Sequence, residues 1–137
     1  MAKAASAVFR ARDAALLLLK ARLDNGAAVT GADVDTEARR VLIAAGYGDR
    51  ILHRTGHSID THGHGDGVNN DDFETHDTRR HLLNTCFSIE PGVYLAGRFG
   101  IRSEIGACIV PGAPGGPKAR LEVRGGGPLQ QEVQLVR

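Results

Sequence analysis

The residues of this chain best suited to chemistry are one histidine and two later glutamates. His57 stands in the segment HRTGHSIDTHGH, whose glycines disfavour a regular helix. Glu90 lies in FSIEPGVY and Glu104 lies in GIRSE, two segments of strand-like composition. One imidazole nitrogen with two carboxylates forms a mixed nitrogen and oxygen donor set, which suits Mn, Co or Zn. The three residues therefore predict a divalent metal site.

Carboxylates can also bridge two cations. A dinuclear hydrolase uses such a pair of cations to hold a hydroxide and to polarise the scissile carbonyl. Glu90 and Glu104 are the candidates for bridging. Arg102 stands two positions before Glu104, so on a strand the two side chains share a face. Arg102 is therefore expected to orient or charge-balance the carboxylates.

Three motifs stand in a fixed order along the chain: HRTGH, then FSIEPGVY, then GIRSE. In that order and at that spacing they resemble the pita-bread metallopeptidases, which include aminopeptidase P, prolidase and, more distantly, methionine aminopeptidase and creatinase. The similar stretch runs from about residue 38 to residue 110. The resemblance implies an α+β fold in which helices cover a curved antiparallel sheet.

The resemblance also implies a role for each matching residue. His57 is expected to ligate one metal, Glu104 to bridge two, and Glu90 to be a ligand that also handles the proton of the nucleophile. His53 and His64 match histidines that contact the substrate or the tetrahedral intermediate and can donate hydrogen bonds to it. A complete site of this family holds two divalent cations.

The family also supplies two aspartate ligands from strands that precede the helices before the His motif. This chain begins with a helical pattern instead, and its aspartates fall in other places. The aspartates considered are Asp13 in the first helix, Asp33 and Asp35 at the start of the second, and Asp66, Asp71 and Asp72 after His57. The chain is therefore expected to be the C-terminal part of a pita-bread domain with three of five ligands. The expected partner is the missing N-terminal portion or a second copy of the chain, which would make a dimer.

The substrate expected from the resemblance is a short peptide containing proline. Two departures from the family pattern lie near the pocket. Asp60 stands where a glycine is usual, and residues 65–70, GDGVNN, replace the usual acidic-proline element. The function predicted is a metallopeptidase of the Xaa-Pro aminopeptidase or dipeptidase type. The alternative is a binding or scaffold protein, or an inactive fragment, that keeps the fold without catalysis.

Simpler interpretations of the same residues stay open. His57 alone could be a structural histidine, and Glu90 with the following Pro and Gly could be only a strand-ending turn. His62 is expected in a solvated loop, and His76 and His81 are expected in an exposed charged segment.

The elements that must position these residues can be outlined from the sequence. The pattern predicts helices at about 4–23 and 34–45, with Asp33 as the cap of the second. A Gly, Asn and Asp-rich loop is expected at 63–70, beside the site. The predicted strands are 51–53, 86–94, 99–110, 120–123 and 132–136, of which 86–94 and 99–110 form a hairpin through 95–98.

Composition and charge narrow the class of protein further. A chain of 137 residues with 42% apolar and 24% charged residues predicts one globular domain, residues 1–137. A net charge of +1 gives no general reason to expect nucleic acid or an anionic membrane as partner. The longest apolar run is too short to cross a bilayer. Cys86 and Cys108 are expected to be free, acting as small hydrophobes in strands, and the cytoplasm is the expected location.

Overall fold

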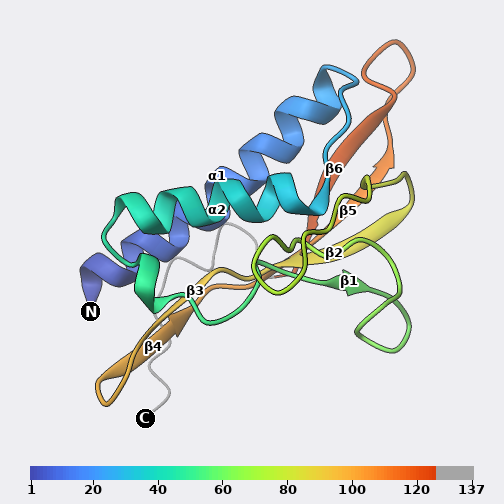
Figure 1. The fold of residues 1–137 in the computed structure, drawn as a ribbon. Helices are drawn as coiled ribbons and strands as arrows, with labels where there is room; N and C mark the ends of the chain where they lie inside the picture. The colour runs from blue at the N-terminus through green and yellow to red at the C-terminus, as the bar shows by residue number, and fades with distance from the viewer. Residues whose placement is uncertain (126–137) are drawn as a thin grey trace.

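The computed structural model describes residues 1–125 as two helices against two small antiparallel sheets (Figure 1). The helices are α1 (Ala2–Asp24) and α2 (Gly31–Ala44), followed by a 3₁₀ turn, η1 (Gly48–Arg50). The strands are β1 (Ser58–Ile59), β2 (Thr85–Ile89), β3 (Gly92–Leu95), β4 (Phe99–Arg102), β5 (Ile105–Pro111) and β6 (Ala119–Arg124). The predicted α+β class with an antiparallel sheet is confirmed.

The long hairpin expected at residues 86–110 is present but is divided between two sheets. β2 and β5 pair in a four-stranded sheet of order β1-β2-β5-β6, while β3 and β4 form a separate two-stranded sheet. Each predicted strand is therefore interrupted once, at Glu90–Pro91 and at Ser103–Glu104. Proline has no N–H to donate to a ladder, which favours a break at Pro91. Both glutamates consequently lie where one sheet ends and the next begins.

The alternation of strand side chains separates a core face from a polar face. Phe87 pairs with Ala107 and Ile89 pairs with Ile105, and all four side chains are buried. They form one core with buried apolar residues of both helices, among them Val8, Ala11, Ala15, Leu19, Val34, Ala38 and Leu42. Residues of the opposite parity, including Ser88, point to the other face. Because Glu90 and Glu104 continue that parity, they emerge on the side away from the helices.

The helices form where the sequence predicts them. α1 packs against α2 and against β3, β4 and β6, and its spacing of buried alanines and leucines explains that face. The N-cap of α2 is Thr30, not Asp33 as predicted. Thr30 accepts a hydrogen bond from the Asp33 N–H, and the Asp33 carboxylate accepts one from the Thr30 N–H, which makes a capping box.

Three other predicted strands have different outcomes. The prediction of a strand at 51–53 is wrong: these residues follow η1 as irregular chain, and it is Ser58–Ile59 that pairs with β2. The predicted strand at 120–123 is present as β6. The strand predicted at 132–136 lies outside the described residues.

The expectation that the cysteines are free is wrong. Cys86 on β2 and Cys108 on β5 are directly opposite each other in the ladder and form a disulfide. Their Cα atoms are 4.1 Å apart. Adjacent strands bring facing residues this close only in one register, and that register is not visible in the spacing of two cysteines.

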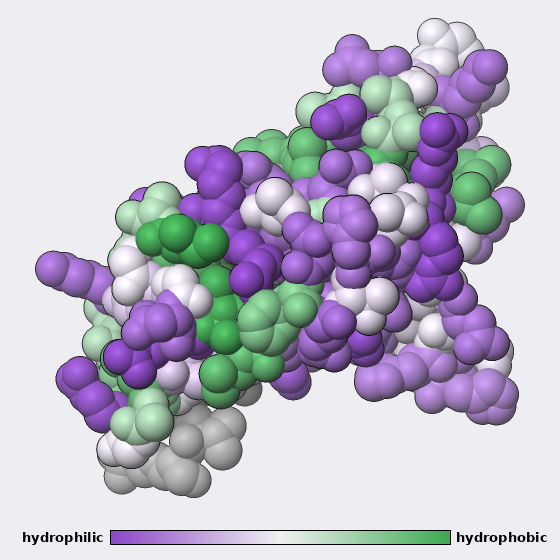
Figure 2. Space-filling model, viewed as in Figure 1, coloured by the Kyte–Doolittle hydropathy of each residue, from purple (hydrophilic) through white to green (hydrophobic). Residues whose placement is uncertain are grey.

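The surface divides into an apolar and a polar part on the face shown in Figure 2. Apolar side chains gather beside the end of α2, whereas the long segment between β1 and β2 is mainly hydrophilic. Among residues 1–125, no helix is both long enough and apolar enough to pass through a membrane.

Candidate metal centre

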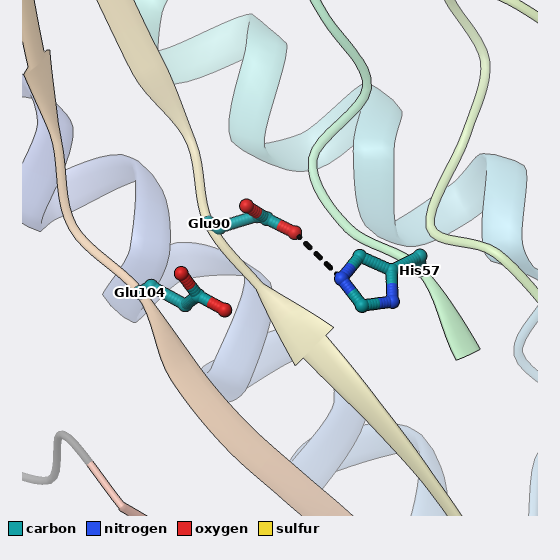
Figure 3. A group of neighbouring side chains, drawn as sticks. All are labelled: His57, Glu90 and Glu104. Atoms are coloured by element: carbon teal, nitrogen blue, oxygen red, sulfur yellow. Dashed lines mark ion pairs between the residues drawn. The ribbon is translucent and has the colours of Figure 1, made fainter. Parts of the chain in front are cut away.

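His57, Glu90 and Glu104 lie together where the two sheets meet (Figure 3). Each offers one donor atom, and the three donor atoms are all within 4.8 Å of one another. His57 comes from the loop before β1, Glu90 follows β2, and Glu104 precedes β5. The three residues singled out from the sequence as ligands are thus brought together, and they are the only such group of histidine, cysteine and acidic residues found among residues 1–125.

The orientation of the His57 ring matches that of a metal ligand. Its Nδ1 is 2.9 Å from the carbonyl oxygen of Ser58, so Nδ1 must carry the proton and donate it to that acceptor. In the neutral ring Nε2 then presents a lone pair, and it lies 3.2 Å from Oε1 of Glu90. Two acceptors at this distance repel unless a proton or a cation lies between them. The donor set therefore fits a divalent cation, which would take the Nε2 lone pair and the carboxylates together.

Arg102 lies across the two carboxylates. Its Nη1 is 3.2 Å from Oε2 of Glu90 and its Nη2 is 3.8 Å from Oε2 of Glu104. The guanidinium is about half exposed, so water screens both ion pairs. The contact with both glutamates is the one that the spacing of Arg102 and Glu104 predicts, and it lowers the repulsion between two neighbouring negative charges.

Ser88 joins the histidine segment to Glu90, and its importance was missed in the sequence. Its hydroxyl accepts a hydrogen bond from the His57 N–H at 2.9 Å and donates one to Oε1 of Glu90 at 2.8 Å. The backbone of Ser88 also donates to the His57 carbonyl. A polar residue two positions before Glu90, on the same face of the strand, was the available signal.

The two other candidate histidines occupy different positions. The ring of His64 stacks against the ring of His57 with centroids 3.9 Å apart, and the residue is exposed. His53 is half-buried and is held at both ring nitrogens: Nδ1 lies 2.7 Å from the Arg54 carbonyl and Nε2 lies 2.7 Å from the hydroxyl of Tyr94. His64 therefore borders the metal centre directly, whereas His53 reaches it through Tyr94.

Tyr94 was also missed in the sequence. Burial raises the pKa of its hydroxyl, the nearby Glu90 charge adds to that rise, and Arg102 opposes it. A side chain at position 92 would collide with this arrangement, because a Cβ there would lie 2.8 Å from the Tyr94 hydroxyl and 3.0 Å from Nε2 of His53. The glycine of the EPG motif is thus explained by the approach of these two rings.

Gly56 explains the glycine of the HRTGH motif in the same way. Its backbone lies directly against β2, and a Cβ would be 2.0 Å from the Ser88 carbonyl oxygen. No side chain fits at this distance. The close approach lets the segment around His57 dock on the end of β2.

The remaining histidines only partly match their expectations. His62 and His76 are exposed, as predicted, and His76 pairs with Asp72 at 2.5 Å. His81 is not in an exposed position: its ring packs on Phe87, with centroids 4.3 Å apart. Burial lowers the pKa of His81 to about 4. The expectation failed because charged neighbours in sequence do not reveal which side chain turns into the core.

None of the upstream or downstream aspartates joins the group of three within the described residues. Asp13 pairs with Arg12, and Asp33 belongs to the cap of α2. Asp35 and Asp71 are completely buried. Arg12 itself is buried and donates to the hydroxyl of Ser103 at 2.9 Å, which ties α1 to the break just before Glu104.

Comparison with known proteins matches most of this chain to one family. The sequence model of metallopeptidase family M24 matches residues 1–109. The Xaa-Pro dipeptidase of Lactobacillus helveticus is 36% identical over 78 residues, which are 56% of this chain and 20% of that protein. A probable dipeptidase PepE of Mycobacterium bovis is 40% identical over 77 residues, 56% of this chain and 19% of the relative. The match with each of these relatives thus covers only about a fifth of its length.

Solved structures give the same result for the fold. An X-Pro aminopeptidase from Thermotoga maritima MSB8 superposes with a TM-score of 0.69 at 29% identity, over 88% of this chain and 29% of that one. The dipeptidase PepE from Mycobacterium ulcerans superposes with a TM-score of 0.66 at 31% identity, over 87% and 28% of the two chains. The neighbours are pita-bread peptidases, so the predicted fold class is confirmed, with this chain equivalent to part of their domain.

Proposed function

The chain belongs to metallopeptidase family M24. We propose that it forms part of a metal-dependent peptidase that cleaves short peptides beside proline. The observation that carries the proposal is the convergence of His57, Glu90 and Glu104 at the junction of two sheets. Relatives named Xaa-Pro dipeptidase and X-Pro aminopeptidase support the choice of substrate class. The proposed substrate is a dipeptide or short peptide with proline after the cleaved bond.

We propose that His57, Glu90 and Glu104 hold the cations, which are Mn, Co or Zn by the donor types present. A bound divalent cation polarises a carbonyl and lowers the pKa of a bound water. Glu90 is the proposed acceptor for the proton of the nucleophile, and the hydrogen bond from Ser88 and the ion pair with Arg102 hold its carboxylate in place. Glu104, on the other side of Arg102, is the proposed bridging ligand.

The proposed substrate contacts are His64 and His53. His64 is exposed and lies against the ring of His57, so it can donate a hydrogen bond to a carbonyl oxygen placed beside the cations. The ring of His53 is held in place by its hydrogen bond with the Tyr94 hydroxyl, so we propose that it contacts the substrate from a fixed position. Arg102 is proposed to hold the two carboxylates near each other through its ion pairs with Glu90 and Glu104.

A partner is part of the proposal. Three protein donors are few for two divalent cations, which in this family are held by more carboxylates. We propose that the additional ligands come from another polypeptide segment, either the N-terminal portion found in the longer relatives or a second copy of this chain. On its own, this chain is expected to bind one cation weakly and to hydrolyse Xaa-Pro peptides far below an ordinary enzyme turnover of about 10 per second.

The test is a titration of the 137-residue chain with Co²⁺, followed by calorimetry and by the visible absorption of the bound ion. His57→Ala and Glu104→Gln each remove one donor and are expected to lower the affinity by about a hundredfold. His62→Ala is the matched control, because His62 is exposed and lies outside the donor group. Equal affinity in all four proteins would contradict the proposed metal centre. Xaa-Pro hydrolysis is then measured with and without added N-terminal portion of a homologue.

The alternative is a binding or scaffold protein that keeps the fold without catalysis. The observation in its favour is Arg102, whose guanidinium forms ion pairs with both glutamates. The two functions differ in what Arg102→Gln does. In a peptidase the variant still binds Co²⁺, while in a scaffold the loss of the ion pairs lowers stability and Co²⁺ binding is absent before and after the change.

A further inference from the structure

The strongest link between the helices and the metal centre is Asp35, which lies on α2 and is completely buried. Its Oδ1 accepts a hydrogen bond from the Thr55 N–H at 2.8 Å, and its Oδ2 accepts one from the Asp72 N–H at 2.7 Å. Arg39 lies one helical turn further, with Nε 3.8 Å from Oδ2. A carboxylate in this position loses its hydration, so it is retained only where hydrogen bonds replace the water.

The first of these bonds leads directly to two of the proposed ligands. Thr55 lies two residues before His57, in the stretch that docks on β2. The carbonyl of Thr55 accepts a hydrogen bond from the Glu90 N–H at 2.6 Å. A single residue, Thr55, therefore connects Asp35 to the backbone of Glu90, and it lies two positions before His57.

The second bond fixes the loop that supports the same stretch. Asp72 follows Asn70, whose carbonyl accepts a hydrogen bond from the Gly56 N–H at 3.1 Å. The side-chain amide of Asn70 donates to the Ser88 carbonyl at 2.8 Å. Ser88 holds both His57 and Glu90, so this path also ends at the metal centre.

We propose that Asp35 is a positioning residue for the metal centre: from α2 it holds the backbone at Thr55 and Asp72 so that His57 and Glu90 keep the spacing that a cation needs. The inference rests on the proposed metal function. Asp35 is not one of the three donors. Its effect passes through the backbone N–H groups of Thr55 and Asp72 and through the hydroxyl of Thr55, which also bonds to the Asp35 carboxylate.

The burial of Asp35 and the hydrogen bonds that it accepts support this role. Burial raises the pKa of Asp35, and hydrogen bonds from Thr55 and from Asp72 oppose the rise. A buried aspartate that accepts backbone bonds from two separate loop positions organises the loop, because each N–H would otherwise lack a partner.

The test compares Asp35→Asn with Asp33→Asn. Asparagine keeps the size of aspartate but turns one oxygen into an N–H donor, which then faces a backbone N–H at position 55 or 72. Asp33 is the matched control: it stands on the same helix and also accepts two hydrogen bonds, both from Thr30 at 2.9 and 2.8 Å, but it has no bond to the histidine segment. Both variants lose a carboxylate of α2, and only one is connected to the metal centre.

Two measurements are made on the full 137-residue chain. The first is Co²⁺ affinity by calorimetry, which is expected to fall about tenfold or more in Asp35→Asn, as for other residues that orient ligands, and to stay within twofold in Asp33→Asn. The second needs no metal: NMR of the ligand-free protein follows the His57 ring nitrogens and the Glu90 amide. Both signals are expected to move in Asp35→Asn and to stay in place in Asp33→Asn.

The outcomes separate this inference from the proposed function. If the wild type binds no Co²⁺ but the His57 and Glu90 signals move in Asp35→Asn, the metal proposal fails and the positioning role stands. If Asp35→Asn leaves both the affinity and the signals as in the wild type, the positioning role is overturned.

A folding failure of Asp35→Asn does not end the test. Thr55→Val is then used, since it keeps the shape of the side chain and removes only the hydroxyl that also bonds to Asp35. It is expected to lower Co²⁺ affinity about threefold and to shift the Glu90 amide, on the scale of one lost hydrogen bond. Unchanged affinity and an unchanged Glu90 amide in a folded Thr55→Val variant overturn the proposal.

Discussion

The segment that carries His57 and the strand pair that carries the two glutamates are held by different kinds of bond. β2 and β5 form a regular antiparallel ladder, reinforced by the Cys86–Cys108 disulfide. The segment from residue 53 to residue 77 has almost no ladder. Side chains of other segments hold its backbone instead, as Asp35 does for Thr55 and Ser88 does for His57.

The difference shows that the positions of the proposed ligands are fixed in two ways. The hydrogen bonds of a ladder repeat along the strand. Many bonds therefore fix the strand register, and that register fixes the positions of the glutamates. The histidine segment depends on a few single contacts, each of which has no substitute. We therefore expect single substitutions to have larger consequences in the histidine segment than in the strands, unless they remove the disulfide.

The largest effect is expected from Gly56→Ala. A Cβ at this position would lie 2.0 Å from the Ser88 carbonyl oxygen, so the segment must leave β2, at a cost of about 4 kcal/mol in the free energy of unfolding. Urea unfolding measures the change. The control is Gly63→Ala in the same loop, where nothing lies within 4 Å and only the positive φ of 89° is strained. That control is expected to lose about 1 kcal/mol, and an equal loss in both variants would show that the docking is not close.

Reduction of the disulfide is the second prediction and tests the strand side of the comparison. The bridge closes a sequence separation of 22, and opening it is expected to lower the free energy of unfolding by about 3 kcal/mol. Urea unfolding is measured with and without a phosphine reductant, and thiol titration follows the two cysteines. The Cys86→Ser/Cys108→Ser double variant is the control, because its stability should not respond to the reductant.

The third prediction is a pH dependence of stability caused by His81. Burial lowers the pKa of this ring to about 4 in the folded protein, against about 6.5 in the unfolded chain. Between these two values the unfolded state binds more protons, so stability falls as the pH is lowered from about 6.5 to about 4. From pH 6 to pH 5 the loss is expected to be about 1.2 kcal/mol.

The reason lies in the two ring nitrogens. Nε2 donates to the side-chain oxygen of Asn70 at 2.8 Å, while the buried Nδ1 has no hydrogen-bond partner among residues 1–125, so a proton there would lack an acceptor. His81→Gln keeps a donor for Asn70 and removes the titrating ring. The unfolding free energies of the two proteins at pH 6 and pH 5 should therefore diverge; parallel curves would place His81 in solvent.

The smallest effect is expected at the joint between the two regions. Ser88→Ala removes the hydroxyl that links His57 to Glu90 and is expected to cost about 1 kcal/mol of stability. Co²⁺ affinity should fall about tenfold, because two proposed ligands lose their common support. Ser58→Ala is the control, since that hydroxyl accepts a hydrogen bond from the Gly67 N–H and, among residues 1–125, has none with Glu90. A larger loss of Co²⁺ affinity in the control than in Ser88→Ala would contradict the proposed role of the Ser88 hydroxyl in linking His57 to Glu90.

The chemistry of the site and the existence of most elements could be read from the sequence. The alanine and leucine content predicted the first helix, a capping signal before residue 34 predicted the second, and a Gly-containing turn between strand-like segments predicted the hairpin that carries the glutamates. His57, Glu90, Glu104 and Arg102 were recognised because residue type and order are written directly in the chain. Propensity and periodicity act over a few residues, so a local pattern is enough to predict them.

What the tertiary structure decided depends on segments far apart in the chain. The pairing of Cys86 with Cys108 follows from a register between two strands, and the burial of His81 follows from its packing on Phe87. The part played by Asp35 depends on a helix meeting a loop about twenty residues later. Such contacts are set by how the surfaces pack, because burial and hydrogen bonding reward only groups that come together in space. The sequence by itself determined which groups could do the chemistry, and the packing determined how they are held.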